Sequence, residues 1–250
     1  MAQPITARRK SGGLSENIKT ILYAGLIAVG IRTVAFEPFN IPSGSMIPTL
    51  LVGDYLFVSK YSYGYSHFSL PFSPPLFSGR IFGRLPDRGD VAVFKLPRDT
   101  RTDYIKRIIG LPGDRIQMKA GQLYINGEKV QRKPAGEFLA EDGGTSTLYE
   151  RYLETLPNGR EHYILKASDD GPLDNTPEYK VPDGYVFAMG DNRDNSQDSR
   201  VMNAVGFVPV ENLVGRAEFI FLSVGGSASL WQIWDWPFEI RWHRLFSGIS

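Results

Sequence analysis

A single long run of hydrophobic residues stands out near the start of the chain. It extends from Ile18 to Phe36 and is interrupted only by Lys19 near its start and Arg32 near its end. A helix that crosses a bilayer needs about 20 mostly apolar residues, so the run is barely long enough. Long basic side chains can extend toward the two interfaces, which suits Lys19 and Arg32. We predict a transmembrane anchor over residues 15–36; a buried helix of a soluble protein is the alternative.

The charges around this run predict its orientation. Arg8, Arg9 and Lys10 precede it, and more positive charge lies before the run than after it. Because basic flanks stay on the cytoplasmic side of a membrane, residues 1–14 are expected in the cytoplasm and the rest of the chain outside it. No convincing small-x-small cleavage site follows, which favours an uncleaved anchor over a removed signal peptide.

Beyond Phe36 the apolar positions come in short runs that are typical of β-strands. A hairpin is predicted over 122–130, because Asn126-Gly127 is the strongest short hairpin signal. No internal repeat is evident and helices are scarce, so the predicted fold class is mainly β. The other predicted strands cover 54–61, 90–94, 104–111, 185–189 and 216–223.

A polar, turn-rich stretch divides this β-rich region. It covers residues 131–180 and contains Gly143-Gly144, Pro157-Asn158-Gly159 and Asp169-Asp170-Gly171-Pro172. We interpret it as the outer part of an inserted β subdomain, 119–181, remote from any chemistry, with its charges on a solvated face. The β core would then consist of residues 37–118 and 182–229.

Two segments are too apolar to be simple solvated linkers. Both suit a membrane surface, where amphipathic rings lie at headgroup depth, and packing on the β core is the alternative for both. The first, Tyr61 to Arg88, contains Phe68, Leu70, Phe72, Leu76, Phe77, Ile81 and Phe82. The second is the tail, 230–250, which contains Trp231, Trp234, Trp236, Phe238, Arg241, Trp242, Arg244 and Phe246.

Composition excludes several classes of function. A net charge of +1 gives no electrostatic case for a nucleic-acid partner. The absence of cysteine rules out disulfides, thiolate metal sites and cysteine nucleophiles. A length of 250 residues allows one sizeable core with an insertion.

The stretch from Ile41 to Leu50 carries the first candidate for chemistry. Pro42 and Pro48 restrict φ and remove backbone donors, so the stretch is a stiffened loop. Gly44 lets the backbone approach whatever Ser45 attacks and frees nearby N–H groups to bind an oxyanion. Ser45 is therefore a candidate nucleophile, and an ordinary Ser/Gly/Pro turn is the alternative.

A serine nucleophile needs a base, and Lys106 is the strongest candidate. The three histidines, His67, His162 and His243, lie in an aromatic loop, a polar insert and the tail, and none is convincing. Neither a Gly-x-Ser-x-Gly elbow nor a Ser-x-x-Lys motif occurs. Lys106 lies in an apolar strand, where desolvation would lower its pKa. A lysine that extends from a half-buried strand to solvent is the alternative.

A third dense stretch, Gly190 to Arg200, follows an apolar strand and is rich in acids, arginine, asparagine and serine. Such a stretch could supply a hydroxyl that orients the lysine amine. Its charged residues, Asp191, Arg193, Asp198 and Arg200, could cross-link the loop through charge-assisted hydrogen bonds. A solvated polar loop is the alternative.

Together with Gly53 to Lys60, these three stretches closely resemble, in the same order, the sequence boxes of bacterial type I signal peptidases (leader peptidases). The resemblance covers the anchor and most strand-rich sequence, and leaves mainly the insert and the tail uncovered. It implies an antiparallel β-sheet catalytic domain behind one transmembrane helix. The implied activity is that of a serine endopeptidase that removes signal peptides by cutting after small residues.

The resemblance also implies roles for individual residues. Ser45 would be the nucleophile and Lys106 the general base of an acyl-enzyme mechanism. Ser43 would help the Ser45 amide bind the oxyanion, and Ser196 would orient Lys106. No metal or cofactor is required. The four charged loop residues would be structural supports, and the pockets for small side chains would be lined by Phe39, Ile41, Met46, Tyr104 and Ile105.

The partners implied by the resemblance are preproteins with signal peptides, the phospholipid bilayer and the secretion translocon. The implied location is the bacterial inner (cytoplasmic) membrane, with a single span, a cytoplasmic N-terminus and a periplasmic or extracytoplasmic catalytic domain. Two other hypotheses stay open. A self-cleaving Ser/Lys repressor-type protease would use similar chemistry, but the anchor argues against it. The other is a catalytically silent, membrane-tethered β domain that binds extracytoplasmic peptides.

Overall fold

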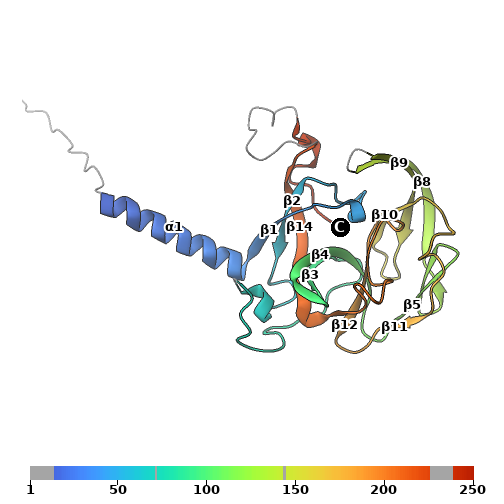
Figure 1. Cartoon of the computed structure of the whole chain (residues 1–250), viewed down its shortest axis with the longest axis horizontal. Helices are drawn as coiled ribbons and strands as arrows, with labels where there is room; N and C mark the ends of the chain where they lie inside the picture. The colour runs from blue at the N-terminus through green and yellow to red at the C-terminus, as the bar shows by residue number, and fades with distance from the viewer. Residues whose placement is uncertain (1–13, 71, 143–144, 226–238) are drawn as a thin grey trace, which may run out of the picture.

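A computed structural model describes residues 14–70, 72–142, 145–225 and 239–250. Its first element is helix α1 (Leu14–Val34), which projects away from a β-rich body (Figure 1). The part from Glu16 to Val34 is long and apolar enough to cross a membrane, and none of it is buried in the protein. An apolar helix that no other described element covers is suited to a bilayer.

The largest sheet has seven strands in the order β1-β2-β14-β3-β4-β12-β13. All of its pairs are antiparallel. The predicted mainly β fold, with antiparallel sheets behind one N-terminal apolar helix, is confirmed. The strands are β1 (Phe36–Asn40), β2 (Asp54–Ser59), β3 (Val91–Leu96), β4 (Asp99–Gly110), β12 (Tyr185–Met189), β13 (Val208–Pro209) and β14 (Leu213–Ser223).

Two smaller antiparallel sheets lie on the side of the body away from α1 (Figure 1). Asn126 and Gly127 have φ angles of 55° and 86° in the turn between β6 and β7, so the predicted hairpin is confirmed. The first sheet has the order β11-β5-β6-β7, with β5 (Arg115–Lys119), β6 (Gln122–Ile125), β7 (Glu128–Lys129) and β11 (Tyr179–Lys180). The second has the order β10-β9-β8, with β8 (Gln131–Asp142), β9 (Thr145–Thr155) and β10 (Glu161–Lys166).

The large sheet is buried on both faces at its centre. Successive side chains of β3 point to opposite faces, and Val91 and Val93 pack in one apolar cluster while Ala92 and Phe94 pack in another. Continuous burial makes β3 and its neighbour β4 a rigid base for side chains that point out of the sheet. Four short 3₁₀ turns complete the described elements: η1 (Gly44–Met46), η2 (His67–Ser69), η3 (Val210–Asn212) and η4 (Trp242–Arg244).

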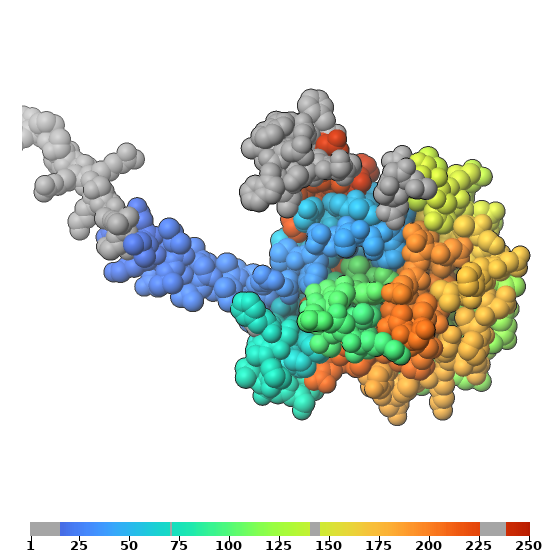
Figure 2. All heavy atoms as spheres, viewed as in Figure 1, coloured from blue at the N-terminus to red at the C-terminus, as the bar shows by residue number. Residues whose placement is uncertain are grey.

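The apolar segment 61–88 lies beside the end of α1 (Figures 1 and 2). Its backbone is closed by an antiparallel bridge between Tyr65 and Ile81. Several of its apolar side chains are exposed rather than packed on the core, which favours an apolar surface outside the protein as their partner. They are Phe72, Leu76, Ile81, Phe82 and Leu85.

The described part of the tail, 239–250, packs along β14. Isolated bridges join Val224 to Ile240 and Phe219 to Gly248, and Arg244 forms an ion pair of 2.5 Å with the buried Asp54. These contacts favour core packing for the tail backbone. The rings of Trp242 and Phe246 are nevertheless 62% and 76% exposed. The other predicted membrane-contacting residues of the tail, Trp231, Trp234, Trp236 and Phe238, lie outside the described residues.

Candidate active site

Ser45 lies on η1, which is fixed by hydrogen bonds on both sides. The Ile41 N–H donates to the Asp54 carbonyl at 2.9 Å, and the Leu50 N–H donates to the Met46 carbonyl at 2.9 Å. The side chains of Met46 and Leu50 are fully buried and hold the turn against the core. A buried, tightly anchored turn restricts where the Ser45 hydroxyl can lie.

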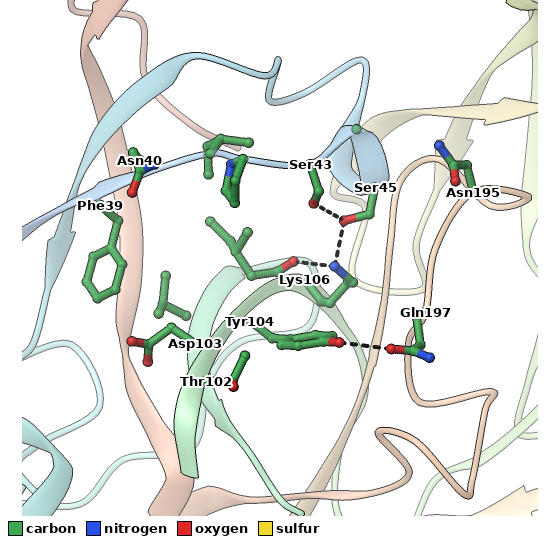
Figure 3. A pocket seen from close by; sticks show the side chains of 15 residues that line it. Phe39, Asn40, Ser43, Ser45, Thr102, Asp103, Tyr104, Lys106, Asn195 and Gln197 are labelled. Atoms are coloured by element: carbon green, nitrogen blue, oxygen red, sulfur yellow. Dashed lines mark hydrogen bonds between the residues drawn. The ribbon is translucent and has the colours of Figure 1, made fainter. Parts of the chain in front are cut away.

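Lys106 projects from β4 toward this hydroxyl. Its Nζ lies 2.6 Å from Ser45 Oγ and donates to the Ile105 carbonyl at 2.9 Å (Figure 3). Burial lowers the pKa of Lys106 to about 8, although the carboxylates of Asp198 and Asp191 act in the opposite direction. An amine that is largely neutral near pH 8 and within reach of a serine hydroxyl can accept its proton.

The Ser43 hydroxyl lies at the same turn, with its Oγ 3.4 Å from Ser45 Oγ. Ser43 is the residue that precedes η1 and has an extended backbone. Its side chain lies beside that of Ser45, as Figure 3 shows. This places a second hydroxyl where it could donate to an oxyanion formed at Ser45.

Ser196 and the loop that carries Ser45 both lie against Gly190. A side chain at position 190 would come within 2.2 Å of Ser196 Oγ and 2.5 Å of the Ser45 carbonyl oxygen. Only glycine permits this approach without displacing backbone. Ser196 Oγ is buried and has no hydrogen bond of good geometry among the described residues, so the expected bond to Lys106 is not formed in this structure.

A buried ion pair supports both sides of the site. Arg107, the neighbour of Lys106 on β4, forms a bidentate pair with Asp191 at 2.8 and 2.7 Å. The Thr49 hydroxyl donates to the same carboxylate at 2.5 Å. Burial opposes ionisation of Asp191, but Arg107 outweighs it and lowers the pKa of this carboxyl. The pair thus joins the strand of the lysine, the loop of the serine and the polar loop 190–200.

The polar loop is fixed by two more buried pairs. Asp198 accepts two hydrogen bonds from the Arg200 guanidinium at 2.9 Å each. Burial opposes ionisation of Asp198, but Arg200 outweighs it and lowers the pKa of this carboxyl. Arg193 pairs with Glu154 of β9, whose carboxylate also lies 3.3 Å from the imidazole of His162. The alternative of a solvated polar loop is therefore wrong for Asp191, Arg193, Asp198 and Arg200, which are buried.

Glu154 was missed in the sequence, and His162 was considered only as a base and set aside, because both belong to the insert. The prediction that the insert lies remote from the chemistry is wrong at β9 and β10, which contact the loop that carries Ser196. An apolar cluster also joins Ile47 of the serine loop to Leu165 of β10. In the sequence, Glu154, His162 and Leu165 look like ordinary polar and apolar residues of a polar stretch.

A cleft of about 560 Å³ opens in front of Ser45 and Lys106 (Figure 3). Phe39, Ile41, Tyr104 and Ile105 line it, as expected for the pocket residues. Met46 does not line the cleft, because its side chain is fully buried in the core on the far side of the turn. Sequence reasoning missed six other lining residues: Asn40, Val93, Thr102, Asp103, Asn195 and Gln197.

Comparison with known proteins gives a family match and similar relatives. Residues 14–222 match the sequence model of the family described as signal peptidase, peptidase S26. Signal peptidase I of Rickettsia conorii is 43% identical over 240 residues, which cover 89% of this chain and 88% of the relative. Signal peptidase I of Rickettsia typhi is 43% identical over 253 residues, which cover 94% of each chain.

A crystal structure of a signal peptidase I from Enterococcus faecalis V583 is 27% identical in sequence and covers 53% of this chain and 97% of that chain, with a TM-score of 0.31. The N-terminal apolar helix is compatible with a membrane anchor, and the family and its curated relatives define a serine endopeptidase. The family match over most of the length identifies the class more closely: the chain belongs to the signal peptidase family, peptidase S26.

Proposed function

We propose that this protein removes signal peptides from exported preproteins by an acyl-enzyme mechanism in which Ser45 is the nucleophile and Lys106 the general base. The observation that carries the proposal is the 2.6 Å distance between Lys106 Nζ and Ser45 Oγ inside a buried site. The family of the chain supports the reaction, and the geometry supports these two residues as its agents.

In the first step, neutral Lys106 takes the proton of Ser45 as the oxygen attacks the scissile carbonyl. The amine of the mature protein leaves with a proton returned from Lys106, and the signal peptide stays on Ser45 as an ester. Lys106 then takes a proton from water, which attacks the ester, and gives this proton to Ser45 Oγ as the signal peptide leaves. The pKa of about 8 supports both transfers, because the amine can hold and release a proton near neutral pH.

The tetrahedral intermediates carry negative charge on the carbonyl oxygen. The backbone N–H of Ser45 and the hydroxyl of Ser43 are the donors proposed for this oxyanion. Ser196 is proposed to orient the Lys106 amine during turnover, because its buried hydroxyl lies against the Ser45 loop. Asp191, Arg193, Asp198 and Arg200 are proposed supports that keep this loop in place.

The substrate is proposed to lie extended between β1 and β4. Phe39 and Ile41 line one wall of the cleft and Ile105 the other, so the pockets before the scissile bond are apolar and shallow. Such pockets favour a substrate with small side chains at two positions that are separated by one other residue. Tyr104 is also proposed to contact the substrate.

The helix α1 is proposed to anchor the enzyme in the bacterial inner membrane, with residues 1–14 cytoplasmic and the β body extracytoplasmic. The absence of burial along α1 and the exposed apolar side chains of segment 61–88 support contact with the phospholipid bilayer. The translocon, which delivers preproteins to this surface, is the further partner that this role implies.

The test is cleavage of a detergent-solubilised preprotein by the wild type, Ser45→Ala and Lys106→Ala, with the N-terminus of the product mapped. Cleavage after a small-x-small sequence by the wild type alone is the expected result. Lys119→Ala, at an exposed position of β5, is the control and should cleave like the wild type. Equal activity of all variants would refute the assignment of the site, and an inactive wild type would favour a peptide-binding domain without catalysis.

A further inference from the structure

The cleft is chemically asymmetric about the pair Ser45 and Lys106. Figure 3 shows Phe39 on one side of this pair, and Asn195 and Gln197 on the other. The side of Phe39 carries the apolar pocket residues together with the polar residues Asn40, Thr102 and Asp103. On the opposite side the labelled lining residues are two amides of the polar loop 190–200. A peptide that crosses Ser45 therefore passes from a region of mixed apolar and polar side chains to one formed by amides.

We propose that Asn195 and Gln197 form the subsite for the first residues after the scissile bond, and that this subsite selects polar, uncharged side chains over apolar ones. The inference rests on the proposed function, which assigns the apolar side of the cleft to the residues before the cut. The chain that continues beyond Ser45 is then the start of the mature protein.

The conformation of the loop supports this role. Exposed and buried residues alternate along this loop: Asn195 and Gln197 are exposed and line the cleft, whereas Ser196 and Asp198 are buried. The Asp198 carboxylate accepts a hydrogen bond from the Gly190 N–H at 3.0 Å and pairs with Arg200, so the backbone of this loop is anchored from within. The two amides are thereby presented outward at fixed positions.

Gln197 is fixed further by a bond across the cleft. The hydroxyl of Tyr104, on β4, donates to Gln197 Oε1 at 2.9 Å (Figure 3). The same Tyr104 ring lies 5.3 Å from Lys106 Nζ. The subsite is thus linked to the strand of the general base, and its amide is held close to the bond that is cut.

The chemistry of an amide explains the selection. Asparagine and glutamine side chains each offer two N–H donors and a carbonyl acceptor. A polar side chain or an extended backbone can replace the water that these groups lose, whereas an apolar side chain leaves them unpaired. A mature N-terminus that begins with serine or glutamine should therefore be cleaved more efficiently than one that begins with leucine.

The experiment measures kcat/KM for two series of peptide substrates with the full-length enzyme in detergent. One series varies only the first residue after the cut, glutamine against leucine, and the other varies only the residue before it, alanine against glycine. The wild type should prefer glutamine by about tenfold in the first series. Gln197→Leu should remove or reverse this preference and leave the ratio in the second series unchanged.

Two further variants keep the result interpretable. Tyr104→Phe removes the bond to Gln197 and should reduce the same preference, while Gln131→Leu, at the exposed start of β8, should leave both ratios as in the wild type. The inference is refuted if Gln197→Leu leaves the glutamine-to-leucine ratio unaltered or shifts both series equally. Failure of the proposed function would look different, because the wild type would then cleave neither series.

Discussion

Lys106 combines two properties that oppose each other in most lysines: it is nearly inaccessible to water, and it is positioned to exchange protons. Its side chain is 4% exposed, so burial penalises the ammonium form. The carboxylates of Asp191 and Asp198 limit the depression of its pKa, since they favour the charged form. The result, a pKa of about 8, makes the amine a base near neutral pH.

The pH dependence of activity should follow this pKa. Because only neutral Lys106 can take the Ser45 proton, kcat/KM should rise about tenfold per unit as the pH increases toward about 8, and level off above it. Lys106→Arg should lower kcat/KM by about 10²–10⁴-fold at every pH, since a guanidinium does not deprotonate in this range. A pH series of preprotein cleavage measures both effects. A flat profile for the wild type, or an active arginine variant, would contradict the dyad.

At the scale of elements, the polar loop 190–200 is the part that holds the site together. It contacts the serine loop through the Asn192 N–H, which donates to the Ser45 carbonyl at 3.1 Å. It contacts β4 through Arg107 and Asp191, and β9 through Arg193 and Glu154. Every one of these groups is buried, so the loss of a single partner leaves a charge without compensation.

Glu154→Gln should therefore destabilise the protein by about 3–5 kcal/mol at neutral pH, because Arg193 stays buried without its carboxylate. Burial alone would raise the pKa of Glu154, but Arg193 and His162 lower it to about 2. A depressed carboxyl pKa stabilises the fold above its unfolded value and loses this effect as the pH falls. The difference in the free energy of unfolding between Glu154→Gln and the wild type should thus become smaller as the pH falls from 4.5 to about 2.

Denaturant unfolding of the two proteins across this pH range is the measurement. Glu161→Gln provides the matched control, because Glu161 is an exposed residue of neighbouring β10 and should change the stability by less than about 0.5 kcal/mol. Equal stability of the Glu154 variant and this control at neutral pH would show that the pair does not support the fold.

The sequence predicted those elements whose cause is local. The strands near 54–61 and 185–189 follow from their apolar residues, and the hairpin follows from Asn126-Gly127, whose positive φ angles are a property of the turn itself. The pairing of Glu154 with Arg193 could not be predicted in this way. The two residues are far apart in the sequence, and either would be read as a surface charge.

In the candidate site, too, some features follow from local sequence and others depend on the folded chain. Ser45 and Lys106 were recognised from their local motifs, and the fold brings them within hydrogen-bond distance. Met46 was misplaced because the motif does not reveal which way a side chain points from a 3₁₀ turn. Asn195 and Gln197 were overlooked because the alternation of buried and exposed residues in their loop depends on ion pairs that only the folded chain forms.

At the scale of the whole molecule, α1 and segment 61–88 lie at the same end of the body (Figure 2), and both carry exposed apolar side chains. Phe72 and Phe82 are 103% and 83% exposed, values that are unfavourable for large rings in water. The exposed rings of Trp242 and Phe246 belong to the tail, which packs on β14 instead of this segment. Of segment 61–88 and the tail, segment 61–88 is therefore the one that we expect to contact the membrane.

The absence of cysteine allows a direct test, because any introduced thiol is unique. A dye attached at Phe72→Cys or Phe82→Cys should be strongly quenched by nitroxide-labelled lipid when the full-length protein is reconstituted in vesicles. A dye at Glu128→Cys, on exposed β7 in the sheet away from α1, should be quenched weakly. Equal quenching at all three positions would show that segment 61–88 does not contact the bilayer.

The connection between helix and cleft has a consequence for substrate choice. Strand β1 follows α1 directly, has five residues, and its Phe39 and Asn40 line the cleft. A strand of that length spans about 17 Å, so with α1 as the proposed anchor we expect Ser45 to be held at a nearly constant height above the membrane surface. We then expect a preprotein to be cut where the distance from its own hydrophobic segment to a small-residue site matches this height, and not at other small residues.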